Sequence, residues 1–296
     1  MNGWIRLAIL TVLLCGIVTA RRGRFRVPIR KGHKRGDRHF AIRPHDEVGR
    51  RMRHYKRSVN KTFPFEQGMG IYFQGDIMLR PELEENAIRS DNNPNVRWPN
   101  GVVPFKITGK FTANEIAIIK KALSNISAQT CIRFVDCQNG QICLPIDNSA
   151  SGCWSYVGRS DYQQYNNVNL QTPGCMTTGT VTHEILHALG LYHEHIRPDR
   201  DEYLLIDRSA LLPEYNTTTF WAANYEKMQY PQVELFGLSY DYGSVMHYSR
   251  YAAAASSNKP VFVNKKPWNK DFGNEVGMSA SDITRVKKMY CNALSG

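Results

Sequence analysis

The pattern of apolar and polar residues predicts a strand followed closely by a helix. Residues 102–107 are mostly apolar, which is typical of a strand, and Pro104 favours an edge position because proline lacks a backbone N–H donor. Thr112 and Glu115 have the spacing of a capping box, which marks a helix start. Apolar residues then recur at helical spacing and predict an amphipathic helix over residues 113–128, whose apolar face belongs to the core.

Later apolar runs add a mixed set of elements. Strands are predicted at residues 131–135, 153–158 and 166–170, and a helix is predicted to begin near Thr177. A final helix is predicted to end at Cys291. This mixture of helices and strands indicates an α+β domain with an active-site cleft. Its length of about 200 residues is enough to bury a sizeable core.

Residues 1–20 have the pattern of a secretory signal peptide. Arg6 supplies the positive start, residues 7–18 form an apolar run, and Thr19-Ala20 offers small residues for cleavage. A membrane anchor is the alternative, but the run is short for a bilayer, which needs about 20 apolar residues. We therefore expect a secreted, extracellular protein without a membrane anchor.

The formal net charge of +12 comes from one segment, residues 21–57, which hold 15 Lys and Arg against 3 Asp and Glu. Residues 58–296 hold 22 against 23, so the predicted domain has no basic excess and no nucleic-acid partner is expected. Few apolar residues and a high charge predict that residues 21–57 are a disordered pro-segment. Arg53-His-Tyr-Lys-Arg57 resembles a dibasic processing site, and a polyanion-binding arm is left open.

An oxidising compartment would pair the cysteines that remain after the signal peptide is removed. These are six, Cys131, Cys137, Cys143, Cys153, Cys175 and Cys291. Six cysteines allow fifteen pairings, and spacing alone does not choose among them. Three glycosylation sequons fit the secreted interpretation, at Asn60, Asn125 and Asn216.

The most informative stretch begins at His183 and reads His-Glu-Ile-Leu-His-Ala-Leu-Gly-Leu-Tyr-His. On a helix, His183 and His187 share one face, one turn apart, so both imidazoles can reach one zinc ion. Gly190 can take the positive φ that ends the helix, after which His193 returns as a third ligand. Glu184 is the candidate general base beside the open metal position. The alternative, a histidine-rich helix without metal, is disfavoured because the full HExxHxxGxxH spacing is present.

A second motif lies downstream at residues 243–248, Gly-Ser-Val-Met-His-Tyr. With the zinc motif, it resembles the Met-turn of the astacin family of metzincins. The stretch from His193 to Asp201 and the cysteine loop from Cys153 to Cys175 are also similar to astacins. The resemblance implies a zincin-like catalytic domain over residues 98–296, with an N-terminal mixed sheet, helices, an active-site cleft and a smaller C-terminal lobe.

The resemblance also implies roles for single residues. Met246 would support the zinc, and Tyr248 would be a phenol ligand that swings away to stabilise an oxyanion. From the sequence alone, a tyrosine after a turn is more often simply packed. The implied disulfides are Cys131–Cys291 and Cys153–Cys175. This leaves Cys137 and Cys143, which could close a small loop.

Phe73-Gln-Gly-Asp76 resembles the astacin propeptide motif, in which the aspartate binds the zinc. Residues 58–97 would then be an inhibitory propeptide, because a carboxylate at the open position displaces the water needed for catalysis. An activating protease is expected to cut within residues 86–97. The resemblance further suggests that the new amino terminus turns inward toward Glu194.

The leading hypothesis is a secreted zinc endopeptidase, with one Zn²⁺ per domain, that acts on protein or peptide substrates. One alternative is a secreted binding protein that has kept the fold and lost the chemistry; the presence of all three histidines, Glu184 and Tyr248 argues against it. A polycationic matrix binder is a third possibility if residues 21–57 survive processing. The sequence does not choose a substrate or an oligomeric state.

Overall fold

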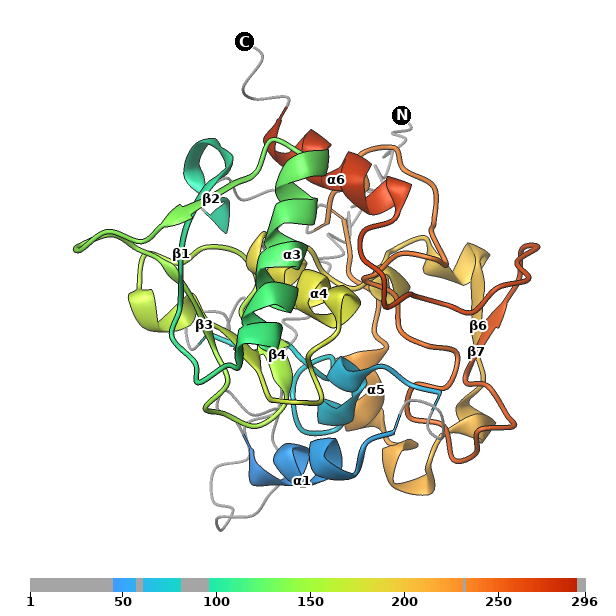
Figure 1. Ribbon diagram of the computed structural model, residues 1–296. Helices are drawn as coiled ribbons and strands as arrows, with labels where there is room; N and C mark the ends of the chain where they lie inside the picture. Colours follow the sequence, from blue (N-terminus) through green and yellow to red (C-terminus); the bar gives the residue numbers. More distant parts are fainter. Residues whose placement is uncertain (1–44, 57–60, 81–95, 231–232, 292–296) are drawn as a thin grey trace, which may run out of the picture.

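The computed structural model describes residues 45–56, 61–80, 96–230 and 233–291 (Figure 1). A five-stranded sheet in the order β2–β1–β3–β5–β4 lies in the first half of the domain. Its strands are β1 (Val102–Ile107), β2 (Arg133–Asp136), β3 (Leu144–Asp147), β4 (Cys153–Ser155) and β5 (Val168–Leu170). Only β4 is antiparallel to its neighbour, so the sheet is mixed, as predicted.

Two helices, α3 (Ala113–Gln129) and α4 (Thr178–Ala188), pack on each other beside this sheet (Figure 1). Helix α3 begins at the predicted capping box: the Thr112 hydroxyl accepts from the Glu115 N–H, and the Glu115 carboxylate accepts from the Thr112 N–H. Helix α4 also contacts β4 and β5, which brings the HExxH helix against the edge of the sheet.

The sheet differs from the sequence prediction in two ways. Strand β1 is an interior strand, so the edge position predicted from Pro104 is wrong. The proline is tolerated because pairing with β3 begins only at Phe105, and Pro104 itself pairs only with Val135 of β2. Strand β3 was not predicted, because its four residues form too short an apolar run to be recognised.

Residues 191–291 form the C-terminal lobe, which has less regular structure than the first half. It contains the antiparallel pair β6 (Leu204–Ile206) and β7 (Phe262–Asn264) and the helices α5 (Thr218–Asn224) and α6 (Ala280–Tyr290). Helix α6 ends at Tyr290 with Cys291 as its C-cap, one residue before the predicted end. Single 3₁₀ turns make up much of the rest of the described chain: η1 (Pro64–Gly68), η4 (Pro99–Gly101), η5 (Gln163–Tyr165), η6 (Glu194–Ile196), η7 (Arg200–Glu202), η8 (Arg208–Ala210) and η9 (Pro213–Tyr215).

The disorder predicted for residues 21–57 is wrong for part of that segment, because helix α1 (Asp46–His54) forms there. Acidic residues lie in its first turn and basic residues in its last, which suits the helix dipole. Val48 and Met52 are buried against Gly152 and Gly174, which flank the Cys153–Cys175 loop. The sequence analysis missed the apolar face of α1 because it judged residues 21–57 by their overall charge. Residues 1–44, including the predicted signal peptide, lie outside the described residues.

Residues 61–80, called the upstream segment below, are largely buried in the domain. Their apolar side chains are nearly all inaccessible to solvent. Those with no more than 5 % exposure include Phe63, Phe65, Met69, Ile71, Tyr72, Ile77 and Met78. The segment is therefore part of the folded structure and not a loose tether.

The disulfides agree with the pairing implied by the resemblance, Cys131–Cys291 and Cys153–Cys175. Cys137 and Cys143 pair with each other, which settles the loop that the sequence left open. The first disulfide joins the residues just before β2 to the end of α6, so it ties the two halves of the domain together. In the described part of the chain, no helix is long and apolar enough to cross a membrane.

Candidate zinc site

Helix α4 presents His183 and His187 on one buried face, as their spacing predicts. It begins where expected, because the Thr177 hydroxyl accepts from the Thr180 N–H and caps the first turn. Gly190 has a φ of 109°, which ends the helix and turns the chain back toward the site. His193 then returns to face the two helical histidines.

The last carbonyl groups of α4 have partners outside the helix, which fixes its end in place. The Trp98 indole N–H donates to Ala188 O at 2.8 Å, and the Tyr290 hydroxyl donates to Leu189 O at 2.6 Å. Gly158 N donates to His187 O at 2.8 Å. Three distant segments thus hold the turn that carries the third histidine.

Three imidazole nitrogens and one carboxylate oxygen converge at the centre of the site. Nε2 of His193 lies 3.2 Å from Nε2 of His183 and 3.3 Å from Nε2 of His187. Oδ2 of Asp76, from the upstream segment, lies 2.9, 3.2 and 3.6 Å from Nε2 of His183, His193 and His187. All four residues are buried. The sequence separation between the histidines and Asp76 exceeds 100 residues, so the fold alone brings them together.

The opposite nitrogen of each ring faces an oxygen acceptor and therefore carries the proton. Nδ1 of His183 lies 2.7 Å from Val245 O, and Nδ1 of His187 lies 2.7 Å from Leu191 O. Nδ1 of His193 lies 2.8 Å from the side-chain oxygen of Gln74. All three Nε2 atoms then point unprotonated lone pairs at the same centre, which is the usual arrangement of histidine ligands.

This arrangement fits a zinc ion. Tetrahedral zinc, with Zn–N distances of about 2.0–2.1 Å, places two ligand nitrogens about 3.3 Å apart. The observed spacings of 3.2 and 3.3 Å match that value. Without a cation, the lone pairs of three imidazole nitrogens and a carboxylate oxygen would face one another with no hydrogen-bond donor between them. His183, His187 and His193 would hold the metal, and Asp76 would take its fourth position.

The electrostatics agree with neutral histidines and an ionised aspartate. Burial lowers the pKa of His193 to about 3, and burial also lowers the pKa of His183. Burial alone would raise the pKa of Asp76, but His193 and His187 hold it well below its usual range. His183 and His193 are therefore neutral and Asp76 is ionised, as metal ligands need to be.

Glu184 has a different environment from the ligands. Its two carboxylate oxygens are fully buried and have no hydrogen-bond partner among the residues that the structure describes. Burial raises the pKa of Glu184 well above its usual range, and the negative charge of Asp76 raises it further. A buried carboxylate without partners beside a metal position is suited to accept a proton there.

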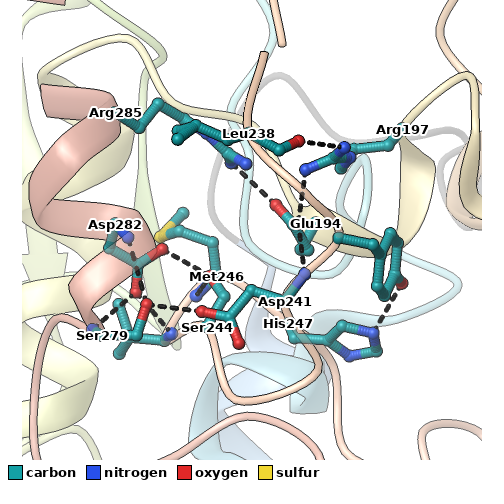
Figure 2. A network of polar contacts seen from close by, with 12 residues as sticks. Glu194, Arg197, Leu238, Asp241, Ser244, Met246, His247, Ser279, Asp282 and Arg285 are labelled. Carbon is teal, nitrogen blue, oxygen red and sulfur yellow. Dashed lines mark hydrogen bonds and ion pairs between the residues drawn. The ribbon is translucent and has the colours of Figure 1, made fainter. Parts of the chain in front are cut away.

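The Met-turn at residues 243–248 is fastened by helix α6 (Figure 2). Asp282 of α6 accepts hydrogen bonds from the Ser244 hydroxyl at 2.6 Å and from the Val245 N–H at 2.9 Å. The Val245 carbonyl in turn holds His183, and Met246 is completely buried. The turn therefore positions the first ligand through its backbone.

Tyr248 follows the Met-turn, but its hydroxyl donates to the backbone carbonyl of Gln74. Its ring stacks on His195, with centroids 3.8 Å apart. His195 and His247 are not ligands: His195 Nε2 lies 2.9 Å from Asn224 O, and His247 Nε2 lies 2.7 Å from the Tyr240 hydroxyl. The upstream segment thus engages the hydroxyl of the residue expected to act on the substrate.

Glu194, which follows the third ligand, is buried between two arginines; its Oε1 is hydrogen-bonded, whereas its Oε2 has an ion pair but no hydrogen bond among the described residues (Figure 2). Oε1 accepts from Arg197 Nη1 at 2.8 Å and from Asp241 N at 3.0 Å. Oε2 forms an ion pair with Arg285 Nη1 at 2.7 Å. Glu194 therefore already has two arginines as cationic partners, and a new amino terminus that pairs with it, as expected from the resemblance, would be a third cation.

The upstream segment crosses the site as an extra chain beside the edge strand β4. Ser155 N donates to Asp76 O at 2.9 Å, and Met78 N donates to Ser155 O at 3.0 Å. Before the aspartate, the Phe65 ring stacks on His183 with centroids 3.7 Å apart. Phe73, Ile77 and Leu79 join a separate apolar cluster with Val157, Tyr192, Ile196, Ala223, Met228 and Val233.

Several contacts in this site were missed by the sequence analysis. Gln74 belongs to the quoted motif, but nothing in its local sequence indicates that its side chain holds His193. Phe65 has no motif at all, and its stacking on His183 depends on the path of the upstream segment. Arg285 carries no motif either, and only the fold buries it and pairs it with Glu194.

Fold and site together define a metallopeptidase domain of the type in which a HExxH helix and a third histidine hold one zinc ion. The sequence matches the model of the Astacin peptidase family over residues 90–291. The chain therefore belongs to the astacin family and carries a zinc metalloendopeptidase domain.

Individual relatives agree with this assignment. The chain is 34% identical over 254 residues to zinc metalloproteinase nas-28 of Caenorhabditis elegans, covering 80% of this chain and 50% of the relative. It is 34% identical over 240 residues to the embryonic protein UVS.2 of Xenopus laevis, covering 78% and 43%. The chain thus spans about half the length of these curated relatives. Among solved structures, the medaka (Oryzias latipes) hatching enzyme HCE-1, a zinc-protease, aligns with a TM-score of 0.58 and 32% identity over 66% of this chain and 92% of its own.

We expect His187→Ala to abolish stable zinc binding, because it removes the central member of three converging nitrogens. Metal analysis of the dialysed protein should fall from about one zinc per chain to below about 0.1. His195→Gln is the matched control, since it changes a buried histidine of the same stretch that binds Asn224. Full zinc retention by His187→Ala would reject the ligand assignment.

Proposed function

We propose that the chain is a secreted endopeptidase made as a zymogen. The observation that carries this proposal is the position of Asp76, whose carboxylate shares one centre with His183, His187 and His193. A carboxylate in the fourth position leaves no place for water on the metal, so the precursor would be inactive. The same segment pairs with Ser155 of β4 and engages Tyr248, which would also exclude a substrate.

Zinc, when bound, supplies a Lewis acid that lowers the pKa of water and polarises a peptide carbonyl. Glu184 would act as the general base, because its unpartnered carboxylate lies beside the ligands and is shielded from bulk water. Ser155 would align an extended substrate, since its N–H and C=O already bind the upstream segment. Tyr248 would donate its hydroxyl to the developing oxyanion once Gln74 has left.

Activation would require cleavage between the upstream segment and the domain. We place the cleaved bond at Arg89–Ser90, because a basic residue suits a trypsin-like activating protease and the astacin match begins at residue 90. This bond lies within the 86–97 window and outside the described residues. Sequencing the amino terminus of the processed protein tests the assignment: a terminus other than Ser90 would reject this bond, and a terminus outside residues 86–97 would reject the window as well.

Secretion is supported by the leader-like residues 1–20 and by three disulfides, which form in oxidising compartments. Of the sequons, Asn216 is exposed and Asn125 is half-buried on α3, while Asn60 lies outside the described residues. We propose glycosylation at these asparagines. Intact-mass analysis of the secreted protein, before and after glycosidase treatment, tests signal removal and glycosylation together.

The activity itself is tested by incubating the processed protein with a library of proteome-derived peptides. Endopeptidase activity predicts new internal cleavage sites that disappear with a chelator and return with zinc. These sites also identify the substrate preference. Peptides left intact by a zinc-loaded, processed protein would favour the alternative of a binding protein that retains only the fold.

Tyr248→Phe is expected to lower kcat by about 100-fold while changing KM little, because the hydroxyl would act mainly in the transition state. Zinc content should be retained, since the three histidines remain. Steady-state kinetics on a peptide identified from the library provide the measurement. A rise in KM with unchanged kcat would instead assign the hydroxyl to substrate binding.

A further inference from the structure

Arg80 ends the described part of the upstream segment, and it is buried in the domain with only 6% of its surface exposed. Its guanidinium donates to three consecutive backbone carbonyl groups. Nη2 lies 2.8 Å from Val157 O and 2.6 Å from Gly158 O, and Nη1 lies 3.3 Å from Arg159 O. We call these three oxygen atoms the carbonyl cage. The catalytic domain thus holds a buried cation with backbone acceptors.

The carbonyl cage is a fixed part of the domain and is tied to the zinc helix. Gly158 N donates to His187 O at 2.8 Å, and Arg159 N donates to Val96 O at 2.7 Å. Gly158 has a φ of 70°, and a Cβ there would lie 2.6 Å from Val96 O, so only glycine fits. Val96 follows the proposed cleavage bond. All these constraints therefore remain when the upstream segment leaves, and the cage should keep its shape.

The cage depends on Arg80 for its hydrogen bonds. Among the residues that the structure describes, no other group donates to the carbonyl oxygens of Val157, Gly158 and Arg159. Val157 and Gly158 are buried, and a buried carbonyl group without a donor costs free energy. Departure of the upstream segment therefore leaves three acceptors that favour a new donor, and a cationic donor makes the strongest hydrogen bonds.

The cage lies on the path of an extended chain that leaves the metal along β4. The upstream segment pairs with Ser155 of β4 through Asp76 O and Met78 N, and then continues to Arg80. Four residues of extended chain cover about 13 Å, which bounds the distance along the chain from Asp76 to Arg80. A peptide that pairs with Ser155 in the same way would place a side chain beside the cage, three or four residues from the reacting carbonyl.

We propose, on the basis of the endopeptidase function above, that the carbonyl cage is a substrate subsite that takes an arginine or lysine side chain. Arginine fits best, because its planar guanidinium presents several donors in a fixed fork, as Arg80 does. Lysine brings the same charge with fewer donors. A carboxylate would meet only acceptors, and an apolar side chain would leave the carbonyl groups without donors. The subsite therefore selects positive charge at one position of the substrate.

The first test compares peptides that the processed, zinc-loaded enzyme cleaves. Cleavage sites in a proteome-derived library should be enriched in arginine and lysine at one position, three or four residues from the cleaved bond. Replacing that arginine by norleucine should lower kcat/KM by about 10- to 100-fold, mainly through KM, and lysine should recover part of the loss. A control peptide with the arginine moved by one residue should match the norleucine peptide, because successive side chains of an extended chain point to opposite faces.

A variant of the enzyme locates the effect at the cage. Arg159→Glu replaces a cation that pairs with Asp161 by a carboxylate on a cage residue. It should raise the preference for arginine over norleucine by about threefold or more. Arg133→Glu changes an exposed residue of β2, at the opposite edge of the sheet from β4, and should leave the preference unchanged. An unchanged preference in Arg159→Glu would place the arginine-binding group elsewhere and overturn the proposal.

A binding measurement separates the subsite from the proposed function. A synthetic octapeptide with the sequence of residues 73–80 should bind the processed, zinc-loaded enzyme, and Arg80→Met in that peptide should raise the Kd by about tenfold or more. Equal Kd values, no measurable binding of either octapeptide, or a cleavage library without basic enrichment at a fixed position would overturn the proposal. An enzyme that binds the octapeptide through Arg80 but cleaves no peptide would reject the proposed function while supporting the cage as a cation-binding site.

Discussion

Glu184→Gln in the processed enzyme is expected to lower kcat by about 10²–10⁴-fold with the zinc content unchanged. The amide keeps the size of the side chain but cannot take a proton from water. Both carboxylate oxygens of Glu184 are unpartnered in the described structure, so the substitution breaks no hydrogen bond. It also relieves the burial of a carboxylate, and the variant should be at least as stable as the wild type.

The measurement is kcat on a peptide substrate together with the zinc content of the same sample. Glu184→Asp serves as a second variant, because it keeps the carboxylate base but its shorter side chain places that base farther from the reacting water. It should retain more activity than Glu184→Gln. Near-normal turnover by zinc-loaded Glu184→Gln would remove Glu184 from the mechanism, whatever the role of the histidines.

Asp76→Ala is expected to raise the peptidase activity of the uncleaved precursor by at least about tenfold. Because the folded segment holds this carboxylate at the metal, its effective concentration exceeds the roughly millimolar value of a flexible tether, so a single carboxylate can saturate the metal in the wild type. Without it, the segment keeps its apolar contacts, its β4 pairing and the hydrogen bonds of Gln74, but loses its metal ligand, so it should open more often. Phe65 and Ile77 remain buried in the cleft, so we expect partial activity and faster self-activation.

The controls separate metal ligation from folding of the segment. Asp46→Ala removes an exposed carboxylate from α1 of the same precursor and should remain inactive. Asp76→Asn keeps the shape but is a weaker metal ligand, so its activity should fall between the wild type and Asp76→Ala. An uncleaved Asp76→Ala precursor as inactive as the wild type would show that filling of the cleft, and not the carboxylate, maintains latency.

The features that depend on short spacings could be predicted from the sequence. The spacing of His183 and His187 predicted the zinc helix, and Gly190 predicted where it ends. The structure confirms both predictions. The capping box at Thr112 gave the start of α3. In each case the determining residues lie within one or two turns, so local physics is sufficient.

The features that depend on distant contacts could not be predicted. Arg285 and Glu194 are 91 positions apart, and only the fold makes a buried ion pair of two ordinary charged residues. The apolar face of α1 was masked by surrounding charges, because composition averages over a whole segment. The path of the upstream segment through the cleft was also unpredictable in detail, since its residues carry no periodic pattern. Only the motif at Asp76 indicated where it would cross the metal.

The central claim is that this chain carries a zinc peptidase centre that its own carboxylate blocks until cleavage. The most direct test measures zinc content and peptide hydrolysis in one preparation, before and after cleavage between the upstream segment and Trp98. We predict about one zinc per chain in both states. Peptide hydrolysis should appear only after cleavage; a chelator should abolish this hydrolysis, and added zinc should restore it. Equal activity before and after cleavage, or a zinc-loaded cleaved enzyme that hydrolyses no peptide, would contradict the claim.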